Sequence, residues 1–263
     1  MAGFCGTEEQ QALQRRTQEM RDWIASTPGI YNAGRFIGVD DPDRVPEPLI
    51  EEMLARDGLI GFRMISPAQA DRIFPPLEAK GYRIDTWDIL VGTPDTAGVE
   101  ARAITGRLVP EGITVKTILD GPEGKDTVEV QRFLATAGLA PFPGSMLAER
   151  PPLARTIVLR VGRHIIATGH AYFPHNAHSR FRNYAWIGLI AVGETWRGLT
   201  FGRLINAMLV EAAFDELGAS HVYEMIAPSN LPSRRMGEAC GLKLDPTLRC
   251  GVAVSNDAAR FTR

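Results

Sequence analysis

The segment from Tyr184 to Gly218 constrains the fold more than any other part of the chain. It opens with YAWIGLIAV, an apolar run that is long enough for a buried strand and too short for an ordinary helix. From Phe201 to Leu217 apolar residues recur at spacings of three and four, the pattern of an amphipathic helix, and Gly218 follows as the expected stop. The segment therefore predicts a strand, a short loop and a helix, in that order.

The loop between this strand and this helix contains Arg197, Gly198 and Gly202. The first N–H groups of a helix lack intrahelical acceptors and lie at the positive end of the helix dipole, so they attract anions such as phosphate. Glycine lets the backbone approach such an anion, and an arginine adds a charged donor. The loop fits a phosphate-binding site and equally fits an ordinary strand-to-helix turn.

Further strands and helices are predicted on both sides of this segment. After residue 111 we expect a strand at 112–119, a helix at 126–139, a hairpin of 155–161 with 163–173, a strand at 221–227, a short helix from Asn230 and a last strand pair within 242–255. Before residue 110 we expect three helices, the first with a capping box at its start and the third interrupted at Pro75 and Pro76, and then a strand at 82–92. This alternation predicts an α/β or α+β fold, with an N-terminal α/β region at 1–110 and a second domain at 111–263.

Residues 111–255 resemble the GNAT superfamily of acetyl-CoA-dependent N-acetyltransferases. The family signature, Arg/Gln-x-x-Gly-x-Gly/Ala, lies between a strand and a helix, and this chain matches it at Arg197 and Gly202. A downstream Asn-x-x-Ala/Ser signature is matched at Asn230 and Ser233. The resemblance implies a GNAT-like mixed central sheet flanked by helices, acetyl-CoA as co-substrate and an amine as acceptor.

The resemblance also implies which residues hold acetyl-CoA. In the family, the strand before the signature loop diverges from its neighbour, and its unpaired backbone groups bond the pantetheine arm. The corresponding residues here are Leu189, Ile190, Ala191 and Val192, and the Val192 N–H is the implied oxyanion donor. The implied pyrophosphate site consists of the backbone amides of Arg197, Gly198, Leu199, Thr200, Phe201, Gly202 and Arg203. Asn230, with Ser233, would bond the pantetheine from the far side, although Asn230 is equally placed to cap a helix.

Two positions depart from the family pattern. Thr200 stands at the central glycine of the signature, where its backbone N–H is kept and its hydroxyl adds a donor. Gly237 stands where many family members carry a tyrosine that protonates the departing thiolate, and glycine cannot do so. An enzyme with this sequence would therefore need another proton source, and a catalytically silent acyl-CoA-binding or regulatory module is the alternative function.

The candidates for the catalytic base are Glu224, His170 and His175. Glu224 is on the strand before Asn230, where some family members carry a catalytic glutamate, but it is one residue further from the asparagine, and such a shift turns a strand side chain to the other face. A histidine near its ordinary pKa of about 6.5 is also a suitable base. No acidic or cysteine partner has metal-ligand spacing to these histidines, so no metal is expected.

Two short stretches of the N-terminal region resemble two stretches of the C-terminal region, and we call this similarity the internal echo. MISPAQ at 64–69 resembles MIAPSN at 225–230, and LEAKGYRID at 77–85 resembles GEACGLKLD at 237–245. Both stretches read as the end of a strand, a helix, a glycine and a second strand. A repeated supersecondary unit is typical of duplication, so we predict a degenerate GNAT-like tandem repeat that lacks its own cofactor loop; chance likeness of two short units is the alternative.

Composition and charge narrow the class of protein. The 263 residues are 44% hydrophobic and carry a net charge of −2, which disfavours nucleic acid as a partner, and no apolar run reaches the length of a membrane span. An odd number of cysteines, three, indicates a reduced, cytoplasmic chain. We therefore expect a cytoplasmic N-acetyltransferase whose N-terminal region shapes the acceptor pocket or mediates assembly, for example as a homodimer.

Overall fold

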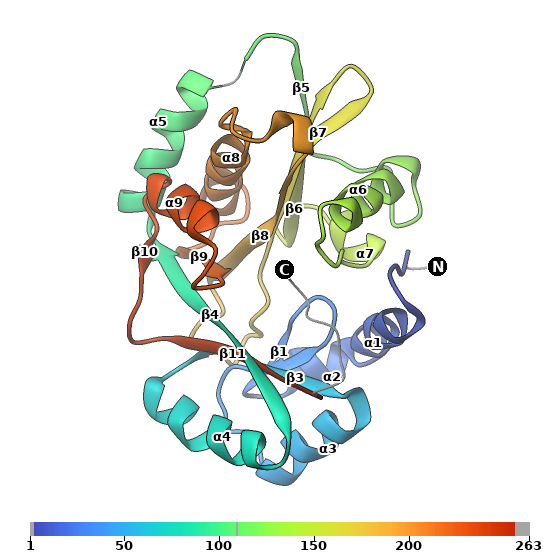
Figure 1. Cartoon of the computed structure of the whole chain (residues 1–263), viewed down its shortest axis with the longest axis vertical. Helices are drawn as coiled ribbons and strands as arrows, with labels where there is room; N and C mark the ends of the chain where they lie inside the picture. Colours follow the sequence, from blue (N-terminus) through green and yellow to red (C-terminus); the bar gives the residue numbers. More distant parts are fainter. Residues whose placement is uncertain (1–2, 109, 256–263) are drawn as a thin grey trace.

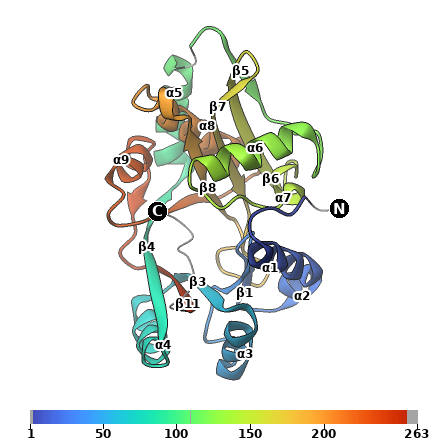
Figure 2. The same ribbon diagram turned by 45° about the vertical axis from the view of Figure 1, so that its right-hand side comes forward.

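The computed structural model describes residues 3–108 and 110–255, which form one continuous mixed sheet with helices on both faces (Figures 1 and 2). Within these residues the strand order is β1-β2-β3-β11-β4-β9-β8-β7-β6-β5, and β10 pairs with β4. The strands are β1 (Ile30–Asn32), β2 (Ile37–Val39), β3 (Leu59–Ile65), β4 (Tyr82–Gly92), β5 (Ile113–Lys116), β6 (Ala154–Val161), β7 (His164–Tyr172), β8 (Tyr184–Val192), β9 (His221–Ile226), β10 (Lys243–Leu244) and β11 (Arg249–Ser255). The predicted α/β class with a mixed, helix-flanked sheet is confirmed.

Helices pack on both faces of strands β6 to β9 and around strands β1 to β3. The helices are α1 (Glu8–Glu19), α2 (Arg21–Ser26), α3 (Glu47–Asp57), α4 (Pro67–Ala79), α5 (Val99–Leu108), α6 (Lys125–Thr136), α7 (Gly144–Leu147), α8 (Phe201–Asp215) and α9 (Leu231–Ala239), with single turns at Pro94–Gly98 and Glu194–Trp196. Helices α5 and α8 pack on one face of strands β6 to β9, and α6 and α7 pack on the other. Helices α2, α3 and α4 pack around β1, β2 and β3 (Figure 1).

The central segment and the first helix form where the sequence predicts them. Strand β8 spans the whole apolar run, and α8 begins at Phe201 and ends before Gly218, which has a left-handed φ of 74°. The capping box at the start of α1 is present, because the Thr7 side chain accepts from the Gln10 N–H and the Gln10 side chain accepts from the Thr7 N–H. The predicted hairpin is β6 with β7, joined so that Val161 faces His164.

Two expectations about the local structure are wrong. Pro75 and Pro76 do not interrupt α4, which continues to Ala79, because Ala70 and Leu77 are buried on either side of the prolines and this packing outweighs the lost backbone hydrogen bonds. The last two strands also do not pair with each other. Strand β10 pairs with β4, while β11 leaves this half of the molecule and pairs with β3 and β4.

The two halves of the chain share the sheet by exchanging strands. The C-terminal strand β11 lies between β3 and β4 of the N-terminal half. The long strand β4 pairs with β11 over Tyr82–Trp87 and then with β9 over Asp88–Gly92, so it connects the two halves. Residues of both halves therefore meet at the centre of one sheet.

The internal echo of the sequence is matched by the strand pairing. Units β3–α4–β4 and β9–α9–β10 have the same order of elements, and Gly81 and Gly241, which follow their helices, both have left-handed φ angles, of 88° and 80°. Arg63 of β3 pairs with Cys250, and Glu224 of β9 pairs with Leu90. Arg63 and Glu224 are equivalent positions in the two units, and so are Leu90 and Cys250, so equivalent residues have equivalent partners. This repeat of pairing is consistent with a duplication, which stays a prediction.

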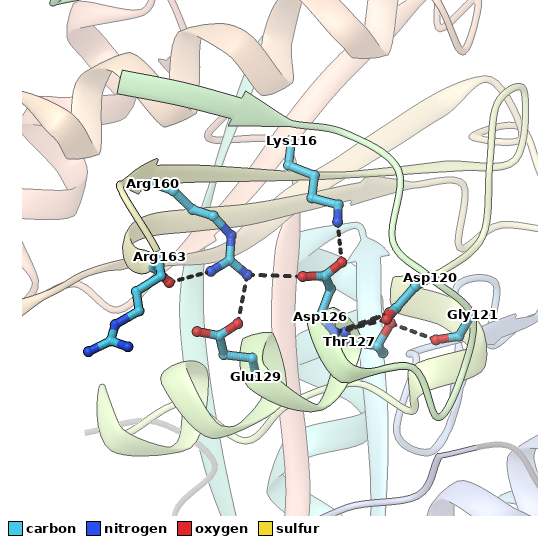
Figure 3. A network of polar contacts seen from close by, with 8 residues as sticks. All are labelled: Lys116, Asp120, Gly121, Asp126, Thr127, Glu129, Arg160 and Arg163. Atoms are coloured by element: carbon cyan, nitrogen blue, oxygen red, sulfur yellow. Dashed lines mark hydrogen bonds and ion pairs between the residues drawn. The ribbon is translucent and has the colours of Figure 1, made fainter. Parts of the chain in front are cut away.

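A charged network fixes α6 to the edge of the sheet (Figure 3). Arg160 on β6 donates to Glu129 at 2.8 Å and to Asp126 at 3.3 Å, and Lys116 on β5 also pairs with Asp126. The Asp120 carboxylate accepts from the Asp126 N–H at 3.1 Å and so stabilises the first turn of α6. The residues that follow the C-terminus of α6, 137–139, line the central cavity described below.

Candidate active site

Strands β8 and β9 are parallel and diverge after a short paired stretch. They pair only from Tyr184 with His221 to Trp186 with Tyr223, and beyond these pairs β8 stays bonded to β7 alone. A register shift in β7–β8 accompanies a left-handed φ of 51° at Leu189. The divergence leaves the backbone groups of β8 that face β9 without a strand partner, as the family resemblance implies for 189–192.

The orientation of the Val192 N–H follows from its neighbour. Gly193 donates its N–H to the carbonyl oxygen of Ile166 on the β7 side, at 2.8 Å. Successive N–H groups of a strand point to opposite sides. The Val192 N–H therefore points away from β7, into the space that opens between β8 and β9.

A cavity of about 310 Å³ opens at this divergence. Both halves of the chain line it. The C-terminal half contributes residues 186–190 and 224–227, Asn230, Ser233 and Met236, and the N-terminal half contributes Tyr31, Arg35, Phe36, Arg63 and Trp87. Residues 137–139, just after α6, and Cys250 with Val252 of β11 complete the lining. The strand exchange is what brings these two groups of side chains to one space.

The signature loop leads from this cavity to the N-terminus of α8. Gly198 and Thr200 have left-handed φ angles of 79° and 67°, and the first intrahelical bond of α8 runs from the Leu204 N–H to the Thr200 carbonyl oxygen at 3.0 Å. The amides of residues 201–203 therefore lack an intrahelical acceptor. Arg197 is at the start of the loop, where its Nε donates to the Val192 carbonyl oxygen at 3.4 Å.

The backbone angle at Thr200 explains why the family favours glycine there and gives a test. A residue with a Cβ in the left-handed region is strained by about 1 kcal/mol. We expect Thr200→Gly to raise the free energy of unfolding by up to about 1 kcal/mol, measured by urea denaturation. Thr200→Ala removes the hydroxyl and keeps the strain, so it should give no gain. A loss of stability in the glycine variant would contradict the assignment of strain.

Asn230 serves as the N-cap of α9 and also lines the cavity. Its Oδ1 accepts from the Ser233 N–H at 3.2 Å, which is the capping role that the sequence left open. Because this bond occupies the amide oxygen, the amide nitrogen is the group available to a bound molecule. Ser233 lies beside it in the cavity lining.

Glu224 is a buried carboxylate in the cavity lining. Its side chain is almost inaccessible to solvent, and its Oε1 has no hydrogen-bond partner among the residues that the structure describes. Burial raises the pKa of Glu224 to about 7, an effect that the neighbouring Asn206 partly offsets. The carboxyl group is therefore suited to both accept and donate a proton near neutral pH.

Glu224 also accounts for the glycine at position 237. A Cβ placed on Gly237 would lie 3.2 Å from the Glu224 Oε2, tighter than ordinary van der Waals contact. The carboxyl group occupies the space next to the position where other family members carry the tyrosine. A tyrosine at 237 and a glutamate at 224 would therefore compete for the same volume.

The two histidine candidates lie outside the cavity lining. His170 is fully buried, its Nδ1 is 2.8 Å from the Thr156 Oγ1, and burial lowers its pKa to about 3. His175 is also buried, and its Nδ1 is 2.6 Å from the Asp40 Oδ2. A carboxylate can only accept, so the Nδ1 of His175 carries the proton and its Nε2 accepts from the Tyr223 hydroxyl at 3.0 Å.

The sequence analysis expected the N-terminal region to shape the acceptor pocket but named none of the residues that line the cavity from that side, above all Arg63. A signal was available, because the internal echo aligns Arg63 with Glu224, and both prove to line the same cavity. Neither composition nor spacing showed that the halves face each other. Among the described residues no three His, Cys, Asp or Glu side chains are grouped as metal ligands.

The diverging parallel strands, the cavity between them and the adjoining helix N-terminus define the fold of an acetyltransferase of the GNAT class. A sequence model of the acetyltransferase (GNAT) family matches residues 127–242, and this part of the chain is a GNAT domain. No curated protein sequence gives a significant match. In the part of the chain that the structure describes, no helix has the length and apolar character needed to cross a membrane.

Solved structures of low sequence identity share the fold over most of the chain. A GCN5-related N-acetyltransferase from Kribbella flavida matches with a TM-score of 0.59 and 15% identity, over 89% of this chain and 80% of that chain. A tandem GNAT protein from the clavulanic acid biosynthesis pathway matches with a TM-score of 0.53 and 15% identity, over 85% and 76%. A GCN5-related N-acetyltransferase from Sphaerobacter thermophilus matches with a TM-score of 0.51 and 17% identity, over 86% and 76%.

Proposed function

We propose that the protein is an N-acetyltransferase that transfers an acetyl group from acetyl-CoA directly to an amine of the acceptor in a ternary complex. The observation that carries the proposal is the divergence of β8 from β9 beside a cavity that holds a carboxylate with a pKa near 7. The GNAT domain at residues 127–242 supports acetyl-CoA as the donor.

In this proposal the cofactor lies along β8. Backbone groups of residues 189–192 bond the pantetheine arm, and the Asn230 amide nitrogen reaches it from the other side. The pyrophosphate binds the amides of residues 198–203, where the helix dipole and the Arg197 guanidinium favour negative charge. The Val192 N–H is oriented to bond the thioester carbonyl oxygen as it gains charge.

Glu224 is the proposed base. Its carboxylate takes a proton from the acceptor ammonium, and the free amine then attacks the thioester carbon. The carbon–sulfur bond breaks, and the thiolate of CoA leaves with the electron pair. A CoA thiol has a pKa close to that of cysteine, about 8.5, so the thiolate can be protonated by solvent or by the Glu224 carboxylic acid formed earlier.

The pKa of Glu224 gives this mechanism a defined pH dependence. Only the ionised carboxylate accepts a proton, so kcat should fall about tenfold per pH unit below pH 7 and level off above it. The profile is measured with saturating acetyl-CoA and saturating amine, between pH 5.5 and 8.5. A rate that stays constant from pH 5.5 to 7 would exclude Glu224 as the base.

The proposed function is tested by release of free CoA from acetyl-CoA in the presence of a panel of amines. Release with at least one amine supports the transferase. The missing tyrosine at Gly237 favours one alternative, the silent acyl-CoA-binding module. Tight binding of acetyl-CoA by calorimetry, with no release for any amine, would establish that alternative instead.

A further inference from the structure

We infer that Arg63 binds a carboxylate of the acceptor, so that the substrate is a small amine that also carries a carboxylate, as a free amino acid does. The inference rests on the proposed function, because it names the substrate class of the same site. It arises from the electrostatics of the N-terminal wall of the cavity.

Arg63 is a buried cation without a direct counter-ion. It lies on β3, is 4% exposed and lines the cavity. Among residues 3–108 and 110–255 no carboxylate forms an ion pair with it, and its buried Nε has no hydrogen-bond partner there. A guanidinium cannot lose its charge in a protein, and burying a charge is costly unless an anion compensates it. The cavity is the direction from which such an anion can reach it.

The groups around Arg63 are aromatic and neutral. Its guanidinium carbon lies 4.7 Å from the centre of the Tyr31 ring, 5.8 Å from that of Trp186 and 6.0 Å from that of Tyr223. Cation–π contacts stabilise the charge in part. Burial raises the pKa of the Tyr31 and Tyr223 hydroxyls, which keeps both neutral at physiological pH. The aromatic rings orient Arg63 without supplying the missing negative charge.

A series of hydrogen bonds that begins at Nη1 holds the Arg63 guanidinium in place. Its Nη1 donates to the Tyr223 hydroxyl at 3.2 Å, the hydroxyl donates to His175, and His175 donates to Asp40. Burial lowers the pKa of His175, so the ring is neutral. Asp40 is therefore separated from the guanidinium by two uncharged side chains. This series of bonds fixes the Nη1 of the guanidinium and leaves the donors that it does not use for a ligand.

The position of Tyr31 beneath the guanidinium depends on two glycines. A Cβ at Gly38 would lie 2.3 Å from the Tyr31 ring, and a Cβ at Gly61 would lie 2.7 Å from its hydroxyl oxygen. Neither position tolerates a side chain without moving the ring. The flat face below Arg63 is therefore built into the backbone of β2 and β3.

The rest of the cavity completes the match to an amino acid. Glu224 offers a base for the amine, while Trp87, Met225 and Val252 offer apolar walls for a side chain. Arg35 adds a second cation to the lining, since burial lowers its pKa only to about 10. The site thus combines one proton acceptor, cationic groups and apolar surface within about 310 Å³.

The test compares acids with amides. Alanine, valine, leucine and phenylalanine are offered as free L-amino acids and as their carboxamides, with release of CoA and calorimetric binding measured for each. A site built to bond a carboxylate rejects the uncharged analogue strongly, so we expect kcat/KM for the preferred acid to exceed that of its amide by about a hundredfold or more. Arg63→Met should abolish this ratio, Arg63→Lys should retain part of it, and the exposed control Arg72→Met should leave it unchanged.

Each outcome decides between the two proposals. Equal use of acids and amides by the wild-type protein would overturn the role of Arg63 while the transferase stands, and so would an acid-to-amide ratio that survives Arg63→Met. Selective binding of acids without release of CoA would support Arg63 and contradict the transferase. Neither binding nor release with any member of this panel would overturn the role of Arg63, and release of CoA with another amine would then show that the transferase stands. The comparison within the wild type does not depend on whether a variant folds.

Discussion

Glu224→Gln is expected to slow acetyl transfer by about a hundredfold or more at pH 7, with the affinity for acetyl-CoA unchanged. The amide keeps the shape of the carboxyl group and removes its basicity. Steady-state kinetics and calorimetry with acetyl-CoA measure the two quantities. Glu238→Gln, an exposed change on α9, is the matched control and should leave both quantities unaltered.

The same variant should be more stable than the wild type at alkaline pH. The pKa of Glu224 is about 7 in the folded protein and about 4.3 when the chain is unfolded. The contribution of the protonated carboxyl group to the free energy of unfolding is therefore fully present below about pH 4 and is lost as the pH rises through 7. Removal of the ionisable group should therefore add about 3 kcal/mol to the free energy of unfolding at pH 8 and little at pH 4. A slower variant that is also less stable at pH 8 would indicate damage to the fold rather than loss of a base.

The double variant Arg197→Ala with Gly202→Asp is expected to weaken acetyl-CoA binding by several kcal/mol, a factor of more than about a hundred in Kd. The first change removes a charged donor at the start of the loop. The second places a carboxylate among the amides that we propose bind the pyrophosphate, where it would repel the ligand. A Cβ at Gly202 meets only the Met236 sulfur, at 3.3 Å, and the Val192 side chain, at 3.7 Å, so the fold should tolerate the aspartate.

A control with the same change in net charge lies on helix α4, at the opposite end of the molecule (Figure 1). Arg72 and Ala79 are both exposed there, so Arg72→Ala with Ala79→Asp should leave the Kd within a factor of about two. Equal calorimetric affinity in the wild type and in the signature-loop variant would place the pyrophosphate elsewhere.

The sequence by itself determined the local part of the site. The period of the apolar residues fixed β8 and α8, and the glycine at 198 and the arginine at 197 marked the loop, because strands, helices and turns follow from interactions between residues close in the chain. The family signature implied the ligand of that loop, acetyl-CoA, together with the strand and helix that would hold it. Glu224 was identified as a candidate base in the same way, by its position relative to Asn230.

Only the tertiary structure decided what surrounds that loop. Strand parity argued against Glu224, and its side chain does alternate with that of Tyr223, so that it lies beside Asn206 of α8 and Gly237 of α9. The cavity that opens where β8 and β9 diverge nevertheless reaches it there. His170, a reasonable base by residue type, is packed in the core instead. Arg63 is 161 residues away from Glu224 and reaches the same cavity through the exchange of β4 and β11. Pairing of strands so distant in the chain depends on the burial of whole faces rather than on any local pattern, and for this reason the acceptor side of the site could not be read from the sequence.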